Sequence, residues 1–145
     1  MLVYRIINYK ELELVLNNKF SEIGFIRRRE INSSIRVGNT NKYIIGVRYM
    51  HFFEEIDNLK YKGINKNLYI CTYDISNGIL DKYCGVGKYL SNNSYVYVRE
   101  HAVPSNLINF SNLVSIDKIS DKYVSVYRKI KKNIDFSILL RNIFF

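Results

Sequence analysis

Hydrophobic and polar positions alternate most clearly over residues 95–104, and this pattern predicts a β-strand. Successive side chains of a strand point to opposite faces, so Val98, Glu100 and Ala102 share one small, apolar face. An unpaired carboxylate is costly on such a face, and a residue placed against the local pattern is more often functional than stabilising. Glu100 is therefore the candidate catalytic residue, with an ion pair to an arginine as the structural alternative.

The rest of the pattern predicts short strands separated by short helices. Asn8 and Glu11 resemble a helix-capping box, and the stripe that follows has helical spacing: Leu12, Val15, Leu16 and Phe20. Further strands are predicted at residues 2–7, 43–53, 67–75 and 113–119, and helical segments at 54–61 and 79–83. This order is typical of an α+β fold with a strongly curved, mainly antiparallel sheet. We expect one domain over residues 1–145, with a core over about 2–120 and a basic helical tail over 121–145.

The composition limits the class of protein and indicates an anionic partner. The chain has 145 residues, 48% of them hydrophobic, which suits one globular domain with a core. The formal net charge is +9, and the positive residues gather over residues 27–48 and 122–141. Such a distribution favours a nucleic acid, a phosphate-bearing cofactor or an acidic inhibitor protein as partner, with a solubilising coat as the alternative.

Cysteines and apolar runs bear on metal binding and location. Two cysteines without metal-ligand spacing predict neither a disulfide framework nor a metal site. The N-terminus turns polar too early for a signal peptide, and no apolar run approaches the roughly 20 residues of a membrane helix. We therefore expect a cytoplasmic protein with reduced thiols and no membrane partner.

Three other segments carry residue types that suit a phosphate-bearing or aromatic ligand. The first predicted strand carries Tyr4 and Arg5 side by side. In the basic segment, Arg28 and Arg29 could hold phosphate oxygens, because guanidinium forks match their geometry. His51 lies among aromatic residues and could stack on a flat heterocycle or hydrogen-bond to it. The alternatives are solvated arginines and an aromatic core strand that contains one histidine with satisfied hydrogen bonds.

Together these segments resemble the ADP-ribosyltransferase superfamily, and within it most nearly the DarT-type toxins. Members open with a strand that carries Tyr-Arg or a histidine equivalent and continue into a helix of the form N-L-x-x-I-L-x-x-G, to which residues 3–20 are similar. A basic segment and an aromatic strand follow in the family, and residues 27–29 and 48–53 look like them. The catalytic glutamate of the family lies on a late strand that residues 99–104 resemble. The likeness covers about residues 2–120, and it implies a split sheet.

Three departures from the family pattern bear on the substrate. Arg5 stands where DarT-type proteins have histidine, as in the arginine-type branch of the superfamily. Val98 stands two residues before Glu100, where arginine-modifying enzymes have Glu or Gln, and this argues against arginine as the acceptor. The serine-threonine-serine strand motif of that branch is replaced by His51, Phe52 and Phe53.

The resemblance implies that NAD is the substrate and that Glu100 is the catalytic carboxylate. Cleavage of the nicotinamide–ribose bond passes through an oxocarbenium-like state, which a nearby carboxylate stabilises. The residues that would bind NAD are Tyr4, Arg5, Arg28, Arg29, His51, Phe52 and Phe53. The expected activity is that of an NAD-dependent mono-ADP-ribosyltransferase, acting as an intracellular bacterial or phage-related toxin or defence effector without a metal. The expected partners are a nucleic-acid or protein acceptor and an acidic antitoxin protein.

Two other functions compete with this interpretation. A basic endoribonuclease-type toxin would use His51, His101 and Glu100 as acid–base groups, although adjacent strand residues such as Glu100 and His101 point to opposite faces. A non-catalytic module of the same fold would bind nucleic acid in a salt-sensitive manner. A dinucleotide-binding loop is excluded, because Gly85 and Gly87 lack the third glycine and the strand–turn–helix context of that motif.

Overall fold

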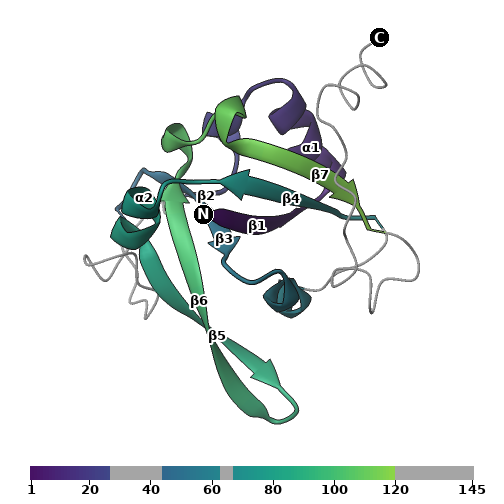
Figure 1. Cartoon of the computed structure of the whole chain (residues 1–145), viewed down its shortest axis with the longest axis vertical. Helices are drawn as coiled ribbons and strands as arrows, with labels where there is room; N and C mark the ends of the chain where they lie inside the picture. The colour runs from purple at the N-terminus through teal and green to yellow at the C-terminus, as the bar shows by residue number, and fades with distance from the viewer. Residues whose placement is uncertain (27–43, 63–66, 120–145) are drawn as a thin grey trace.

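The computed structural model describes residues 1–26, 44–62 and 67–119, and in these ranges the chain has an α+β fold (Figure 1). The strands are β1 (Leu2–Ile7), β2 (Phe25–Ile26), β3 (Arg48–Phe53), β4 (Tyr69–Asp74), β5 (Cys84–Ser91), β6 (Ser94–Pro104) and β7 (Leu113–Lys118). The helices are α1 (Tyr9–Leu16) and α2 (Asn77–Lys82), with 3₁₀ segments η1 (Phe20–Glu22), η3 (Ile56–Lys62), η4 (Ser105–Leu107) and η5 (Phe110–Asn112). The strands lie in the order β5-β6-β3-β1-β4-β7, and β2 also pairs with β3. All pairings between described strands are antiparallel, which confirms the predicted α+β class and mainly antiparallel sheet.

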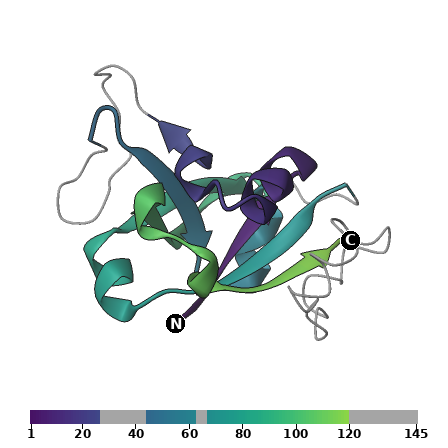
Figure 2. The same cartoon turned by 90° about the horizontal axis from the view of Figure 1, so that it is seen from above.

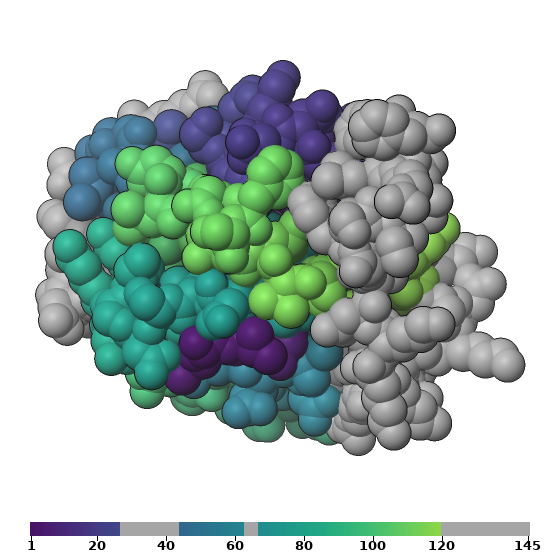
Figure 3. Space-filling view, turned by 45° about the horizontal axis from the view of Figure 1, so that its top comes forward, coloured from purple at the N-terminus to yellow at the C-terminus, as the bar shows by residue number. Residues whose placement is uncertain are grey.

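Helix α1 covers one face of the sheet, as its apolar stripe predicts. The helix begins after Asn8, whose side-chain oxygen accepts a hydrogen bond from the backbone N–H of Glu11 at 2.9 Å. Leu12, Val15, Leu16 and Phe20 are buried and share one core with strand residues such as Val3, Met50 and Phe52. Figures 2 and 3 show the violet N-terminal helical region beside the light-green segment that holds η4 and η5, over this face. The predicted stripe is confirmed for Leu12, Val15 and Leu16, whereas Phe20 lies beyond the end of α1, in η1, and joins the same core from there.

A second core lies on the opposite face, beneath the segment η3. Leu59 is fully buried there and belongs to the same apolar cluster as Phe53, Ile70 and Val98. Full burial of one such leucine side chain contributes about 1.5–3 kcal/mol to stability. This packing holds η3 against β1 and β3 and thereby positions the residues at its C-terminal end.

The sheet opens between β1 and β3. Strand β1 pairs with β4 along its whole length but meets β3 only where Tyr4 lies opposite Phe53. At the other end of β3, Tyr49 pairs with Phe25 of β2. Gly24 makes this approach possible, since its φ of +106° favours glycine and a Cβ atom there would overlap the carbonyl of Tyr49. The middle of β3 is therefore flanked by an opening, with β1 at one end and β2 at the other.

The structure corrects several predicted boundaries. The strand predicted over residues 43–53 begins at Arg48, and β5 was not predicted at all. His101, which alternation places on the face opposite to Glu100, is also fully buried, because both faces of β6 are covered from Glu100 onwards. The predicted helical tail over 121–145 lies outside the described residues. In the ranges that the structure describes, no helix has the length and apolar character needed to cross a membrane.

Candidate functional site

Glu100 lies on β6 as the alternation predicts, nearly buried and with 8% of its surface exposed. The sheet register places it between Phe53 of β3 and Gly85 of β5. Its Oε1 atom accepts a hydrogen bond from the hydroxyl of Tyr89, and its Oε2 atom lies 3.5 Å from Nδ1 of His51. The partners are therefore a phenol and an imidazole, whereas the sequence led us to expect an arginine as the structural partner.

Strand β5 provides the space that the Glu100 side chain occupies. Gly87 lies beside the carboxylate, and a Cβ atom there would overlap Oε1 of Glu100 and come within 2.6 Å of the Tyr89 ring. Tyr89 follows two residues later and points to the same face. The side chain of Glu100 thus lies across β5, over a glycine and against a tyrosine.

An aromatic wall with one ammonium group surrounds Tyr89. The Tyr89 ring stacks on Tyr61 with centroids 5.3 Å apart and an interplanar angle of 19°, and it contacts Phe53 at 6.1 Å. The Lys62 ammonium lies 5.4 Å from the centroid of Tyr89 and 5.9 Å from that of Phe53. Both distances fit cation–π contacts. Among the described residues, Lys62 has no carboxylate within ion-pair distance, so its charge is not compensated there.

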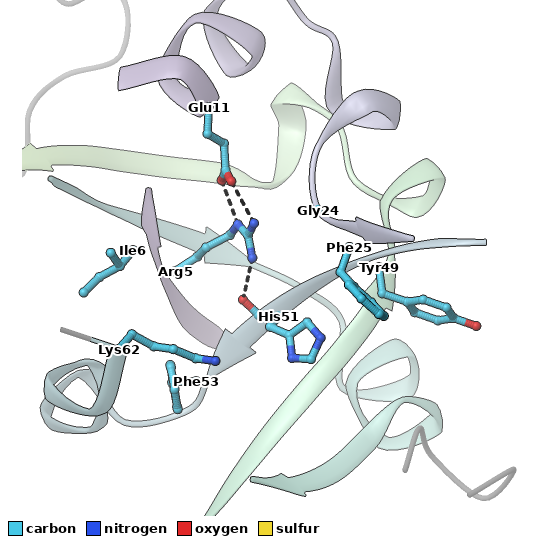
Figure 4. A pocket seen from close by; sticks show the side chains of 9 residues that line it. All are labelled: Arg5, Ile6, Glu11, Gly24, Phe25, Tyr49, His51, Phe53 and Lys62. Carbon is cyan, nitrogen blue, oxygen red and sulfur yellow. Dashed lines mark hydrogen bonds and ion pairs between the residues drawn. The ribbon is translucent and has the colours of Figure 1, made fainter. Parts of the chain in front are cut away.

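A pocket of about 530 Å³ occupies the opening between β1 and β3 (Figure 4). Its lining residues are Arg5, Ile6, Glu11, Gly24, Phe25, Tyr49, His51, Phe53 and Lys62. The volume falls in the range of about 300–1,000 Å³ that is usual for small-molecule sites. Glu100 does not line the pocket itself; it contacts His51, which lines the pocket and whose Nδ1 atom is 3.5 Å from Oε2. The pocket and the candidate catalytic group therefore share His51 and Phe53.

Arg5 is held firmly in the wall of this pocket. Its Nε and Nη2 atoms donate to the two carboxylate oxygens of Glu11 at 2.7 Å each, and Nη1 donates to the backbone carbonyl of His51 at 3.2 Å (Figure 4). Burial alone lowers the pKa of the Arg5 guanidinium, but the hydrogen bond and the charge of Glu11 outweigh burial and raise the pKa above its ordinary value. Arg5 is therefore a permanent cation whose charge Glu11 compensates.

The other residues predicted to bind NAD differ in their placement. Tyr4 lies opposite Phe53 and packs in the same cluster, while His51 and Phe53 line the pocket. The prediction for Phe52 is corrected by the structure. Its side chain is fully buried in the core on the opposite face, with its ring centroid 5.2 Å from that of Tyr73, and it does not line the pocket. Neighbouring strand residues point to opposite faces, so His51 and Phe53 on one face place Phe52 on the other. Arg28 and Arg29 lie outside the described residues.

His101 is separated from this site by the sheet. Its side chain is fully buried, with Nδ1 2.7 Å from the carbonyl of Leu80 and Nε2 2.6 Å from the Glu54 carboxylate. Glu54 also pairs with Arg99 at 3.0 Å. Both ring nitrogens of His101 therefore face acceptors within the fold, and its role is structural. This placement does not favour a joint acid–base role with Glu100, as the alternation had indicated.

Sequence reasoning missed three residues of the site, namely Tyr61, Lys62 and Tyr89. Tyr89 was missed because β5 was not recognised as a strand, although Gly85, Gly87 and Tyr89 share its period-two spacing. Tyr61 and Lys62 lie at the C-terminal end of η3, and only tertiary packing brings them to β5. In the ranges 1–26, 44–62 and 67–119, no group of three His, Cys, Asp or Glu side chains is arranged to hold a metal ion.

No protein-family model, no curated protein and no solved structure matches this chain. The chemistry of the site is therefore inferred from its own residues: one nearly buried carboxylate, an imidazole, an aromatic wall, an uncompensated ammonium and a pocket between diverging strands.

Proposed function

We propose that the protein is an NAD-dependent mono-ADP-ribosyltransferase in which Glu100 is the catalytic carboxylate. The observation that carries this proposal is the setting of Glu100. It is a nearly buried carboxylate without an arginine or lysine partner among the described residues, and it lies beside His51 at a pocket between diverging strands. A carboxylate kept in this way favours a functional role over a stabilising one.

The arrangement of the strands gives independent support. The segments that resemble the ADP-ribosyltransferase superfamily lie far apart in the chain, at the first strand, the aromatic strand and the late glutamate strand. They form β1, β3 and β6, which are consecutive neighbours in the sheet. The opening between β1 and β3 agrees with the split sheet that the resemblance implies. Sequence likeness and spatial arrangement therefore indicate the same site.

The proposed chemistry requires few groups, and the types of residue in the site support it. The ribose–nicotinamide bond breaks with its electron pair going to the nicotinamide nitrogen, which becomes neutral, while positive charge grows on the ribose. Glu100 would stabilise that charge and accept a hydrogen bond from a ribose hydroxyl. The acceptor then forms a bond to the anomeric carbon and releases a proton to solvent. Lys62 would contact the pyrophosphate, and His51 and Phe53 would line the ribose or nicotinamide.

The biological setting and the acceptor belong to the same proposal. A small basic enzyme that consumes NAD and transfers its ADP-ribose group would suit the role of a cytoplasmic toxin or defence effector. The net charge of +9 favours a nucleic-acid acceptor over a basic protein and suits an acidic antitoxin as inhibitor.

A non-catalytic nucleic-acid-binding module is the second candidate, and the β5–β6 hairpin favours it. The hairpin extends from the body of the molecule (Figure 1), and Tyr95 and Tyr97 on one of its faces are each more than half exposed. The Lys88 ammonium lies on the same face, 4.0 Å from the centroid of Tyr95. Exposed tyrosines next to a cation can stack on bases and contact phosphates.

Incubation with radiolabelled NAD separates the two functions. Purified protein is incubated with NAD labelled in its adenylate phosphate, together with DNA, RNA or lysate protein, and free nicotinamide and transferred label are measured. We expect Glu100→Gln to lower NAD cleavage at least about 100-fold. The matched control is Glu55→Gln, a change at an exposed carboxylate, which should leave cleavage unchanged. Full cleavage by Glu100→Gln would refute the assignment, and salt-sensitive nucleic-acid binding without any cleavage would favour the module.

A further inference from the structure

The contact between Tyr89 and Glu100 has a geometry that goes beyond burial of a carboxylate. Tyr89 donates its hydroxyl to Oε1, whereas Oε2 faces His51 and the pocket side. A carboxylate that is held through one oxygen keeps the lone pairs of the other oxygen for a second partner. The two oxygens of Glu100 therefore differ in their partners: Oε1 is held by Tyr89 within the fold, and Oε2 faces His51 on the side of the pocket.

The sequence of β5 is matched to this arrangement. Any side chain at residue 87 would overlap Oε1 of Glu100, so Gly87 is required for the carboxylate to lie where Tyr89 can reach it. Tyr89 is in turn fixed by its stack on Tyr61 and by its contact with Phe53. The glycine that is not part of a phosphate-binding loop thus has another explanation: it makes room for the carboxylate.

We infer that Tyr89 is a positioning residue that orients the Glu100 carboxylate for catalysis and that Gly87 provides the space for it. This inference rests on the proposed ADP-ribosyltransferase function. The groups that face Glu100 are His51 from β3 and Tyr89 from β5, while Lys62 of η3 lies over the Tyr89 ring. Of these, only Tyr89 donates to Oε1 among the described residues, so loss of its hydroxyl releases that oxygen.

The test compares Tyr89→Phe and Gly87→Ala with matched controls. Tyr89→Phe removes one oxygen and keeps the aromatic stack, and its control is Tyr9→Phe, at an exposed position at the start of α1. Gly87→Ala places a methyl group against Oε1, and its control is Gly78→Ala, where a Cβ atom meets nothing within 4 Å. Kinetic constants for NAD cleavage, thermal midpoints and crystal structures are measured for all four variants.

We expect Tyr89→Phe to lower kcat by a factor on the order of 100, because a displaced reacting group costs about that much, while KM for NAD stays within a few-fold. Gly87→Ala should have a similar effect, and in both crystal structures the carboxylate should leave its wild-type position. The two controls should retain wild-type constants. A lower kcat with an unchanged KM is not expected if Tyr89 only packs the hairpin.

Several results would overturn the inference. Wild-type kcat in Tyr89→Phe, or a loss of activity that follows only a lowered thermal midpoint, would show that the hydroxyl does not orient Glu100. An unmoved carboxylate in the crystal structure of Tyr89→Phe would show the same without any assay of turnover. Failure of the proposed function is distinguishable, since it appears as equal NAD cleavage by the wild type and Glu100→Gln, or as no cleavage by either. The inference alone fails where Glu100→Gln is inactive and Tyr89→Phe is fully active.

Discussion

The ion pair between Arg5 and Glu11 joins three elements at the wall of the pocket, and its loss should destabilise the fold measurably. Arg5 lies on β1 and Glu11 on α1, and two N–H···O bonds of 2.7 Å connect them. A third N–H group of Arg5 reaches the His51 carbonyl on β3, in the stretch flanked by the opening. We predict that Glu11→Ala lowers the free energy of unfolding, because it leaves the guanidinium partly buried without its carboxylate.

The magnitude follows from the burial of the two side chains, which are 14% and 15% exposed. Removal of one partner from a buried ion pair costs about 3–5 kcal/mol, and the remaining exposure places Glu11→Ala at the lower end, at about 3 kcal/mol. Removal of both charges leaves no unpaired ion. We therefore expect the double variant of Glu11→Ala with Arg5→Met to be more stable than Glu11→Ala alone, by about 1 kcal/mol.

Urea unfolding followed by circular dichroism measures these differences. The matched control is Glu13→Ala, which removes an exposed carboxylate from the same helix and should change stability by less than about 0.5 kcal/mol. If Glu11→Ala costs no more than Glu13→Ala, the pair does not stabilise the pocket wall. If the double variant is no more stable than Glu11→Ala alone, the reasoning about an unpaired buried ion is wrong.

Two further predictions concern buried groups away from the pocket. Burial raises the pKa of both Cys71 and Tyr73, so both stay protonated in the folded chain above the ordinary thiol pKa of 9.0. The contribution of Cys71 is fully present below that pH and is lost progressively above it, where the unfolded thiol ionises. The free energy of unfolding should then fall by about 1.4 kcal/mol per pH unit from this one group, and Cys71→Ala should reduce the slope. Glu54→Ala leaves Nε2 of the buried His101 without its acceptor and should cost about 2 kcal/mol in urea unfolding, whereas Glu55→Ala, at the exposed neighbouring position, should cost almost nothing. Equal stability of these two variants, or a flat pH profile, would contradict the respective prediction.

Much of the fold could be predicted because its elements are defined by local patterns. Asn8 fixes the start of α1, and the helical stripe fixes its buried face. Period-two alternation likewise predicted the inward face of β6 that carries Glu100. Only one half of the predicted capping box forms. The backbone N–H of Glu11 donates to the side chain of Asn8, but the Glu11 carboxylate binds Arg5 and not the backbone N–H of Asn8. A tertiary partner had replaced a local one, and no local pattern indicates such a replacement.

Strand β5 was missed because its residues lack the apolar alternation on which the prediction relied. Gly85 and Gly87 weaken the strand pattern, and three of the eight residues of β5 are exposed. A usable signal was present at the turn. Asn92 and Asn93 both have positive φ, at 49° and 64°, as a two-residue hairpin turn requires, and asparagine tolerates this conformation well. Attention to that pair would have predicted the hairpin and with it Tyr89.

The charges of the pocket indicate which predicted contacts matter most under the proposed function. Arg5 was expected to bind NAD, but its guanidinium is engaged by Glu11, and the pair contributes little net charge to a ligand. Lys62 contributes an ammonium that no described carboxylate neutralises. In the described part of the pocket, the net attraction for an anion therefore comes from the end formed by Lys62 and Phe53. Under the proposed function, the pyrophosphate of NAD is therefore expected at Lys62, in the pocket that His51 also lines, and His51 in turn contacts Glu100.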